Sequence, residues 1–131
     1  MKKILLVLCM ALMLCGCSKG KTASITLKGN PTTGYEWTYS FSNEGVLKEK
    51  SNNYITDNEN LTGSGGKYDF VFEGEKEGTT KIIFEYKRSW ETEEPLYTLT
   101  YEITVNNKKE IKSSKVTGNY SEDKLPEAVI K

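Results

Sequence analysis

The sequence predicts an all-β protein built as a two-layer sandwich of about six to eight strands. From residue 24 onward, Thr, Tyr, Ile, Val and Phe alternate with polar residues in short segments, which is the pattern of half-buried strands. Turn residues separate these segments, and no segment carries a helical repeat. Six or seven such segments within about 85 residues are typical of a sandwich whose two sheets share one core.

The expected strands lie at residues 24–29, 35–42, 46–57, 67–74, 79–88 and 96–105. The second is the clearest, because Tyr35, Trp37, Tyr39 and Phe41 fall on one face. After residue 107 the composition becomes charged and polar. Residues 108–131 are therefore predicted to form a solvated, polar C-terminal extension, with an extra strand or a short helix packed on the sandwich as the alternative.

The composition argues against whole classes of function. None of the 131 residues is histidine, which removes Ser-His-Asp catalysis, Cys-His catalysis and imidazole metal sites. The 18 basic and 18 acidic residues cancel, so nucleic acid is not an expected partner. An enzyme would need paired carboxylates or Ser-Lys chemistry. The acidic segments 57–60 and 91–94 fit solvated loops better, and the first lacks the ligand spacing of a calcium loop. We expect no enzyme activity, no metal and no cofactor.

The N-terminus predicts export. Lys2 and Lys3 precede eleven mostly apolar residues, a run shorter than the roughly 20 residues of a transmembrane helix and suited to a signal peptide over residues 1–16. The segment Leu14-Cys15-Gly16-Cys17 resembles the lipobox of bacterial lipoproteins, which implies cleavage before Cys17 and a lipid on its sulfur. Residues 17–22 would then be the lipidated cysteine and a spacer, anchoring the exported protein to the cell membrane. An ordinary cleaved signal peptide is the alternative.

Three loops between the expected strands have unusual compositions. They consist of Asn30, Pro31, Thr32, Thr33, Gly34 and Tyr35; of Gly63, Ser64, Gly65 and Gly66; and of Arg88, Ser89 and Trp90. In the first, Pro31 fixes its own φ and Gly34 permits a positive φ, so two stiff threonines stand on a rigid, hydroxyl-tipped wedge. The second lets another backbone approach closely. The third offers Arg and Trp, which are favoured interface anchors. Taken singly, each also fits an ordinary turn, a flexible loop or the edge of a core.

Strand parity predicts that these loops lie together. Two expected strands separate the first loop from the second, and two separate the second from the third. In an up-and-down arrangement the chain therefore returns to the same end of the sandwich each time. A single strand, 24–29, lies between the expected anchor and the first loop. The loops are thus expected at the end of the domain that faces away from the membrane.

In this order and at this spacing, the loops resemble the signatures N-P-T-T-G-[YF], G-x-G-G and R-P-[WF] of the chagasin family of cysteine-protease inhibitors. The resemblance covers roughly residues 23–106 and predicts an inhibitor domain over residues 23–107. It implies an immunoglobulin-like sandwich that inhibits papain-like cysteine proteases reversibly and without covalent bonds. We expect it to act as a monomer.

The resemblance also implies roles for the loop residues. Thr32 and Thr33 would sit over the catalytic Cys and His of the protease, and the glycine loop would lie along one wall of its cleft. Trp90 would stack on an aromatic patch of the other wall, with Arg88 either supporting it or contacting the rim of the cleft. Ser89 replaces the family's proline, so the third loop loses a φ constraint. The alternative function is a lipid-anchored immunoglobulin-like module for binding or adhesion, because a fold alone does not fix function.

Overall fold

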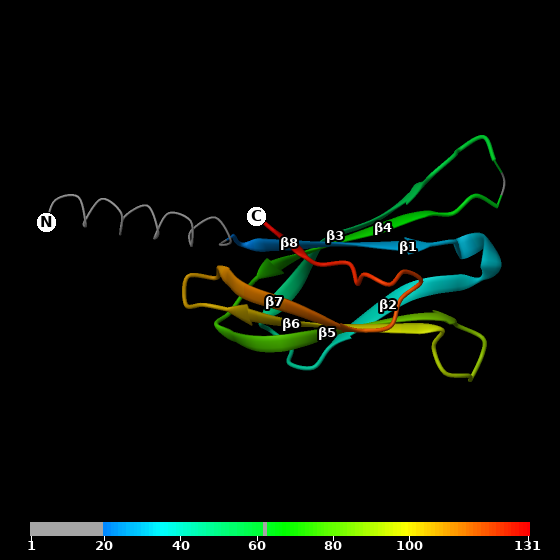
Figure 1. Cartoon of the computed structure of the whole chain (residues 1–131). Helices are drawn as coiled ribbons and strands as arrows, with labels where there is room; N and C mark the ends of the chain where they lie inside the picture. The colour runs from blue at the N-terminus through cyan, green and yellow to red at the C-terminus, as the bar shows by residue number, and fades with distance from the viewer. Residues whose placement is uncertain (1–19, 62) are drawn as a thin grey trace, which may run out of the picture.

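The structure, a computed structural model, describes residues 20–61 and 63–131. Two four-stranded antiparallel sheets pack face to face, with strand orders β3-β4-β1-β8 and β2-β5-β6-β7 (Figure 1). The strands are β1 (Thr22–Gly29), β2 (Tyr35–Phe41), β3 (Leu47–Thr56), β4 (Gly66–Gly74), β5 (Gly78–Arg88), β6 (Tyr97–Val105), β7 (Ile111–Gly118) and β8 (Val129–Ile130). A short 3-10 helix, η1 (Pro31–Thr33), joins β1 to β2. The predicted all-β sandwich is confirmed, and β1 to β6 match the six expected strands.

The expected signal peptide, residues 1–16, and the expected lipidation site, Cys17, lie outside the described residues. Within the part of the chain that the structure describes, no helix is long and apolar enough to cross a membrane.

Phe84 of β5 lies at the centre of the core. Its ring centroid is 5.0 Å from that of Phe70 in the opposite sheet and 5.6 Å from that of Tyr101 in β6. Alternation along β5 buries Ile82 and Phe84 completely. Burying a side chain of this size contributes about 1.5–3 kcal/mol relative to leaving it exposed. Because residues 18–131 contain no cysteine, this aromatic core holds the two sheets together without a disulfide.

The C-terminal segment corrects the prediction that residues 108–131 form a solvated extension. Strand β7 pairs with β6 along the edge of one sheet, and β8 pairs with β1 along the edge of the other. Between them, Tyr120, Leu125 and Ala128 pack against the core. The physical reason is that β6 and β1 would otherwise present unpaired backbone edges, and this segment covers both. Its apolar residues are spaced too irregularly to be recognised as strand in the sequence.

Side-chain hydrogen bonds reinforce this C-terminal cover. The Tyr120 hydroxyl accepts a hydrogen bond from the backbone N–H of Lys28 at 2.6 Å, and the Tyr101 hydroxyl donates to the carbonyl of Pro126 at 2.5 Å. Burial raises the pKa of Tyr101 above that of an exposed tyrosine. The segment therefore joins the edges of both sheets with satisfied polar groups.

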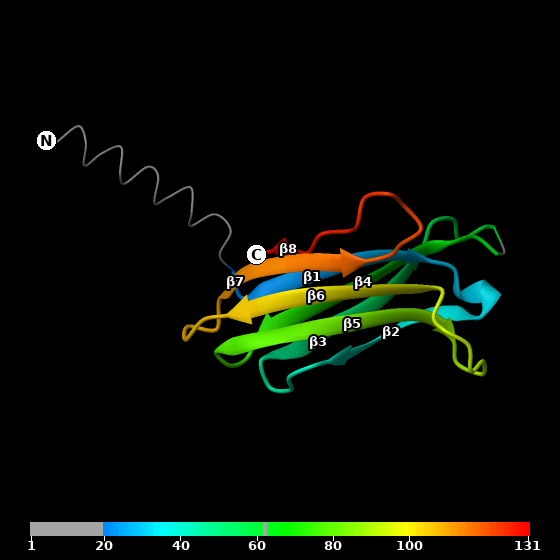
Figure 2. The same cartoon turned by 60° about the horizontal axis from the view of Figure 1, so that its bottom comes forward.

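Different segments of the chain form the two ends of the sandwich. At one end the chain enters β1 and terminates, since Thr22 and Lys131 exchange backbone hydrogen bonds of 3.2 and 3.0 Å. At the other end lie η1, the β3–β4 connection and the β5–β6 connection (Figures 1 and 2). All buried apolar residues of the described chain fall between Ala23 and Ile111. A chain beginning at residue 18 therefore keeps this core intact.

Deleting residues 119–131 should lower the free energy of unfolding by about 2 kcal/mol or more, because the deletion removes the buried surface of Tyr120 and Leu125 and frees the edge of β1. Urea unfolding of the two chains measures the difference. The exposed Asp123→Asn change in the same segment is the matched control and should leave the midpoint unchanged. A deletion chain with the full-length midpoint would support a solvated extension after all.

Candidate functional site

The three unusual loops are bonded to one another at one end of the sandwich, as parity predicts. The Asn30 side chain donates from Nδ2 to the carbonyl of Gly63 at 2.9 Å, which ties the first loop to the second. Arg88 donates from Nε to the carbonyl of Thr33 at 3.0 Å, which ties the third loop to the first. We call this end, formed by residues 30–35, 57–61, 63–66 and 88–96, the loop edge (Figure 1).

The first loop is a closed turn of 3-10 helix. Asn30 caps it, because its Oδ1 accepts from the backbone N–H of Thr32 at 3.1 Å. Pro31 occupies the first helical position, where its missing N–H costs nothing. The N–H of Gly34 closes the turn on the carbonyl of Pro31 at 2.9 Å, and Gly34 reverses the chain at φ 87°. Each residue from 30 to 34 is thus held by its own geometry or by a hydrogen bond.

The threonine hydroxyls of this wedge point back into it. Thr32 Oγ1 donates to Asn30 Oδ1 at 2.5 Å, and Thr33 Oγ1 donates to the carbonyl of Asn30 at 2.6 Å. Pro31, Thr32 and Thr33 are all exposed. The expectation of a hydroxyl-tipped wedge is therefore refined: the hydroxyl protons are committed inside the loop, and a partner meets methyl groups and acceptor lone pairs.

The glycines of the loop edge have different structural roles, although the sequence suggests a single stretch of exposed backbone. A Cβ on Gly66 would lie 2.3 Å from the carbonyl oxygen of Ile55 and 2.6 Å from the hydroxyl of Tyr54, so this glycine packs inside the protein. Gly63 has a φ of 83° and open space around its Cα. A Cβ on Gly65 would make ordinary contacts. The backbone open to a partner therefore runs from Gly63 to Gly65.

Trp90 lies on the first loop. The side chain is 68% exposed, and a Cβ on Gly34 would lie only 2.2 Å from its Cη2 atom. The absence of a side chain at Gly34 thus serves two purposes: it permits the positive φ and it seats the indole. An exposed tryptophan held against a rigid turn is the feature expected of an interface anchor.

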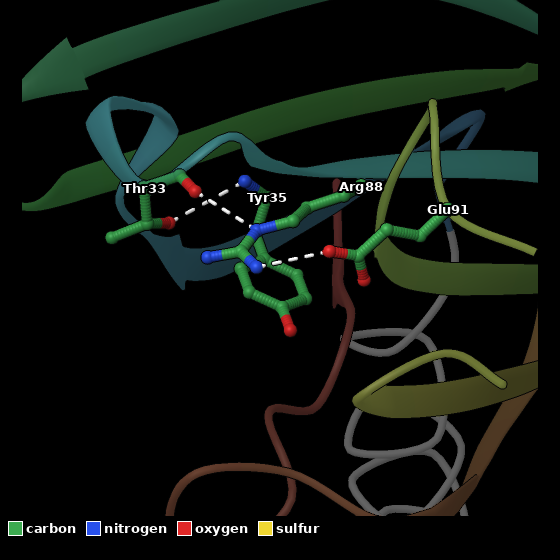
Figure 3. Close-up of polar contacts among 4 residues, drawn as sticks. All are labelled: Thr33, Tyr35, Arg88 and Glu91. Atoms are coloured by element: carbon green, nitrogen blue, oxygen red, sulfur yellow. Dashed lines mark hydrogen bonds and ion pairs between the residues drawn. The ribbon is translucent and has the colours of Figure 1, made fainter. Parts of the chain in front are cut away.

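Arg88 is fixed at three points (Figure 3). Besides the bond from Nε to Thr33, its Nη1 pairs with Glu91 Oε1 at 3.0 Å, and its guanidinium lies over the Tyr35 ring at 4.4 Å from the centroid. The hydrogen bond to Glu91 raises the pKa of Arg88 further above its already high value. Arg88 therefore stays charged and connects the first and third loops.

Exposed apolar side chains gather at the loop edge. Six large apolar residues of the described chain are exposed. Five lie in or beside these loops: Tyr54, Ile55, Leu61, Trp90 and Leu96. Tyr54 and Ile55 are successive residues of β3 and point to opposite faces of its sheet, so these side chains share one end of the sandwich without forming one continuous patch. Only Trp90 belongs to the three sequence motifs. The other four are recognisable in the sequence only as apolar residues within polar, turn-rich segments.

The geometry defines a set of mutually bonded loops at one end of an immunoglobulin-like sandwich. Comparison with known proteins gives the family. The model of the chagasin family of peptidase inhibitors, family I42, matches residues 17–105, so the chain belongs to this family, whose members are inhibitors and not enzymes. The match ends at the last residue of β6, so β7 and β8 lie beyond it.

Two proteins of Entamoeba histolytica illustrate the relationship. The chain is 36% identical to amoebiasin-1 over 90 residues, which is 67% of this chain and 85% of that protein. The crystal structure of the cysteine protease inhibitor EhICP2 superposes with a TM-score of 0.60 at 27% identity, covering 66% of this chain and 80% of the other. These similarities agree with the fold and with the family.

Replacing Gly34 by alanine should cost more stability than replacing Gly63, although both glycines have φ near 85°. Gly63→Ala should lower the free energy of unfolding only by the cost of placing an alanine in the left-handed backbone region, about 1–2 kcal/mol. Gly34→Ala must also displace the Trp90 ring, which should add about 1–3 kcal/mol. Urea unfolding of both variants, repeated in a Trp90→Ala background, measures this excess. The excess should vanish in that background, and equal costs in the parent chain would contradict the seating of Trp90 on Gly34.

Proposed function

We propose that this protein is a reversible, non-covalent inhibitor of papain-like cysteine proteases and that its loop edge enters and blocks the active-site cleft. The observation that carries the proposal is the direct bonding among the three loops. Asn30 donates a hydrogen bond to Gly63, and Arg88 donates one to Thr33. The wedge, the glycine backbone and the loop that carries Trp90 therefore form one rigid unit. Membership of a peptidase-inhibitor family and the cysteine protease inhibitor EhICP2 as a structural neighbour support the same conclusion.

In the proposed complex, Thr32 and Thr33 cover the catalytic Cys and His. Residues 31–33 are wound into a 3-10 turn closed by backbone hydrogen bonds. No peptide bond at the tip is therefore presented in an extended form for attack. The backbone from Gly63 to Gly65 follows one wall of the cleft, and Trp90 lies on the other. Since the loops are already ordered, binding loses little conformational entropy.

Ser89 stands where the family signature has proline, and Glu91 offsets this change. The N–H of Glu91 donates to the carbonyl of Arg88 at 3.2 Å, which closes a turn, and the Glu91 carboxylate pairs with Arg88 across the same turn. A hydrogen-bonded turn and an ion pair thus restrict the third loop in place of the fixed φ of a proline. Both interactions keep Trp90 close to the wedge.

Trp90→Ala should raise the inhibition constant for papain by about 30- to 1000-fold, the range that corresponds to losing a 2–4 kcal/mol anchor. Its thermal midpoint should stay close to that of the parent, because the side chain is 68% exposed. Steady-state inhibition with a small chromogenic substrate, using a chain that begins at residue 18, measures the effect.

The matched control is Val129→Ala, which removes an exposed apolar side chain, 53% accessible, near the opposite end. This variant should inhibit like the parent. A Trp90→Ala protein that retains full inhibition would exclude the proposed binding mode.

We further propose that the mature protein is anchored to the cell membrane by a lipid on Cys17. Gly20, the first described residue, bridges Ile111 at the end of the sandwich opposite the loops. The eight residues of β1 then span the domain, a length of roughly 25 Å at the usual rise per residue. In this arrangement the loop edge points away from the bilayer, where soluble proteases can reach it.

The lipid-anchored protein in vesicles should inhibit a soluble papain-like protease within about twofold of the acyl-free chain, because Gly20, the first described residue, and the loops lie at opposite ends of the sandwich. Inhibition constants of the two forms, measured side by side, test this. Loss of inhibition on anchoring would show that the membrane covers the loop edge. A Cys17→Ser precursor should incorporate no labelled fatty acid, because the acceptor thiol is missing.

A further inference from the structure

Beside the wedge lies a groove of about 490 Å³. Tyr35, Tyr86 and Tyr97 line it with their rings, and Tyr86 stacks on the other two at centroid distances of 5.3 and 5.9 Å. Leu96 of the third loop, 47% exposed, lies along it. The backbone of Gly65 and Gly66 also borders it. The hollow therefore sits among all three loops, within reach of anything that docks on the loop edge.

Among the charged groups around this groove, one carboxylate has neither a hydrogen bond nor an ion pair with the described residues. Lys28 and Arg88 line the groove, but Lys28 pairs with Glu122 and Arg88 pairs with Glu91. The carboxylate of Asp57 makes no hydrogen bond and no ion pair with any residue that the structure describes, while its backbone N–H is fixed to the carbonyl of Gly65 at 2.9 Å. Asp57 is thus held at the groove as an exposed carboxylate that interacts with Lys28 and Tyr54 only through the long-range field.

The charge of the whole loop edge has the same sign. Its acidic residues are Asp57, Glu59, Glu91, Glu93 and Glu94, and its only basic residue is Arg88, which gives a net charge of −4. The chain from residue 17 onward has 16 basic and 18 acidic residues, a net charge of −2. Negative charge is therefore concentrated at the binding end. Such a field favours approach of a positively charged surface.

We infer that the groove receives a lysine or arginine side chain from the rim of the protease cleft, a step that rests on the proposed function. The cation would lie on the tyrosine rings and pair with Asp57. Arg88, which lies over Tyr35 at 4.4 Å, shows that a guanidinium is compatible with these rings. Because Arg88 and Tyr86 already pack on Tyr35, and Tyr86 also stacks on Tyr97, the incoming cation would use the remaining face of Tyr97. The planar guanidinium of arginine suits an aromatic floor beside a carboxylate better than an ammonium does. The inhibitor thereby prefers proteases with a basic cleft rim.

The groove can be tested without a protease. N-acetyl-arginine amide and its neutral isostere N-acetyl-citrulline amide are titrated into the acyl-free chain, and the backbone amide shifts of Gly65, Leu96 and Tyr97 are followed by NMR. The arginine compound should give saturable shifts at these positions and bind at least about fivefold more tightly than citrulline. Equal binding of the two compounds, or the absence of shifts at the groove, would overturn the inference.

Two variants distinguish binding of the cation in the groove from its attraction to the overall negative charge of the loop edge. Asp57→Asn should lose the preference for arginine, whereas Glu59→Gln, which removes the same charge two residues away and does not line the groove, should keep it. If both variants lose the preference for arginine equally, the preference comes from the net charge of the loop edge and not from Asp57 in the groove. Papain inhibition is measured on the same samples. If the parent protein does not inhibit papain, the proposed inhibitor function is wrong. If it inhibits papain but shows no preference for the arginine compound, only the proposed cation binding in the groove is wrong.

A panel of papain-like proteases completes the test. Asp57→Asn should weaken inhibition about five- to tenfold for proteases with a basic residue at the rim and leave the others unchanged. A uniform effect across the panel would contradict a specific cationic contact at this groove.

Discussion

Two side-chain hydrogen bonds make three separate loops into one surface. Asn30 uses its acceptor to close the first loop and its donor to hold the second, so one amide fixes both the shape of the wedge and its distance from the glycine backbone. Arg88 holds the third loop to the carbonyl of Thr33. Neither residue needs to touch a protease to matter, since loops that moved independently would have to be ordered on binding, at a cost of about 0.5–1.5 kcal/mol for each immobilised side chain.

The sandwich beneath these loops supplies a rigid platform through packing alone. Aromatic rings from both sheets meet around Phe84, and the C-terminal segment covers one edge of each sheet through β7 and β8. The second strand carries Trp37 into this core, where its indole N–H donates to the carbonyl of Lys28 at 3.0 Å. The residues on either side of the first loop are therefore anchored in the core, and the rigidity of the wedge continues into the body of the domain.

Period-two patterns made the fold predictable, and the match is best where alternation is strict, as in Tyr35 to Phe41. Parity then located the loops without any contact information. The sequence could not reveal β7 and β8, because edge strands in polar surroundings keep few apolar residues and their partners are far away in the chain. It also could not separate the glycines: Gly66 faces Tyr54, Gly34 faces Trp90 and Gly63 faces solvent. The bracing role of Glu91 and the exposed carboxylate of Asp57 likewise depend on distances between loops, which spacing along the chain does not supply.

The most direct test of cleft occlusion is protection of the protease's own nucleophile. Residues 18–131 contain no cysteine, so in a mixture of this chain with papain any alkylation by iodoacetamide reports on the protease alone. The account predicts that a stoichiometric amount of inhibitor slows alkylation of the catalytic cysteine in proportion to the fraction of enzyme bound, and that dilution restores the original rate. An inhibited papain whose cysteine still reacts at the rate of the free enzyme would show that the loops bind elsewhere.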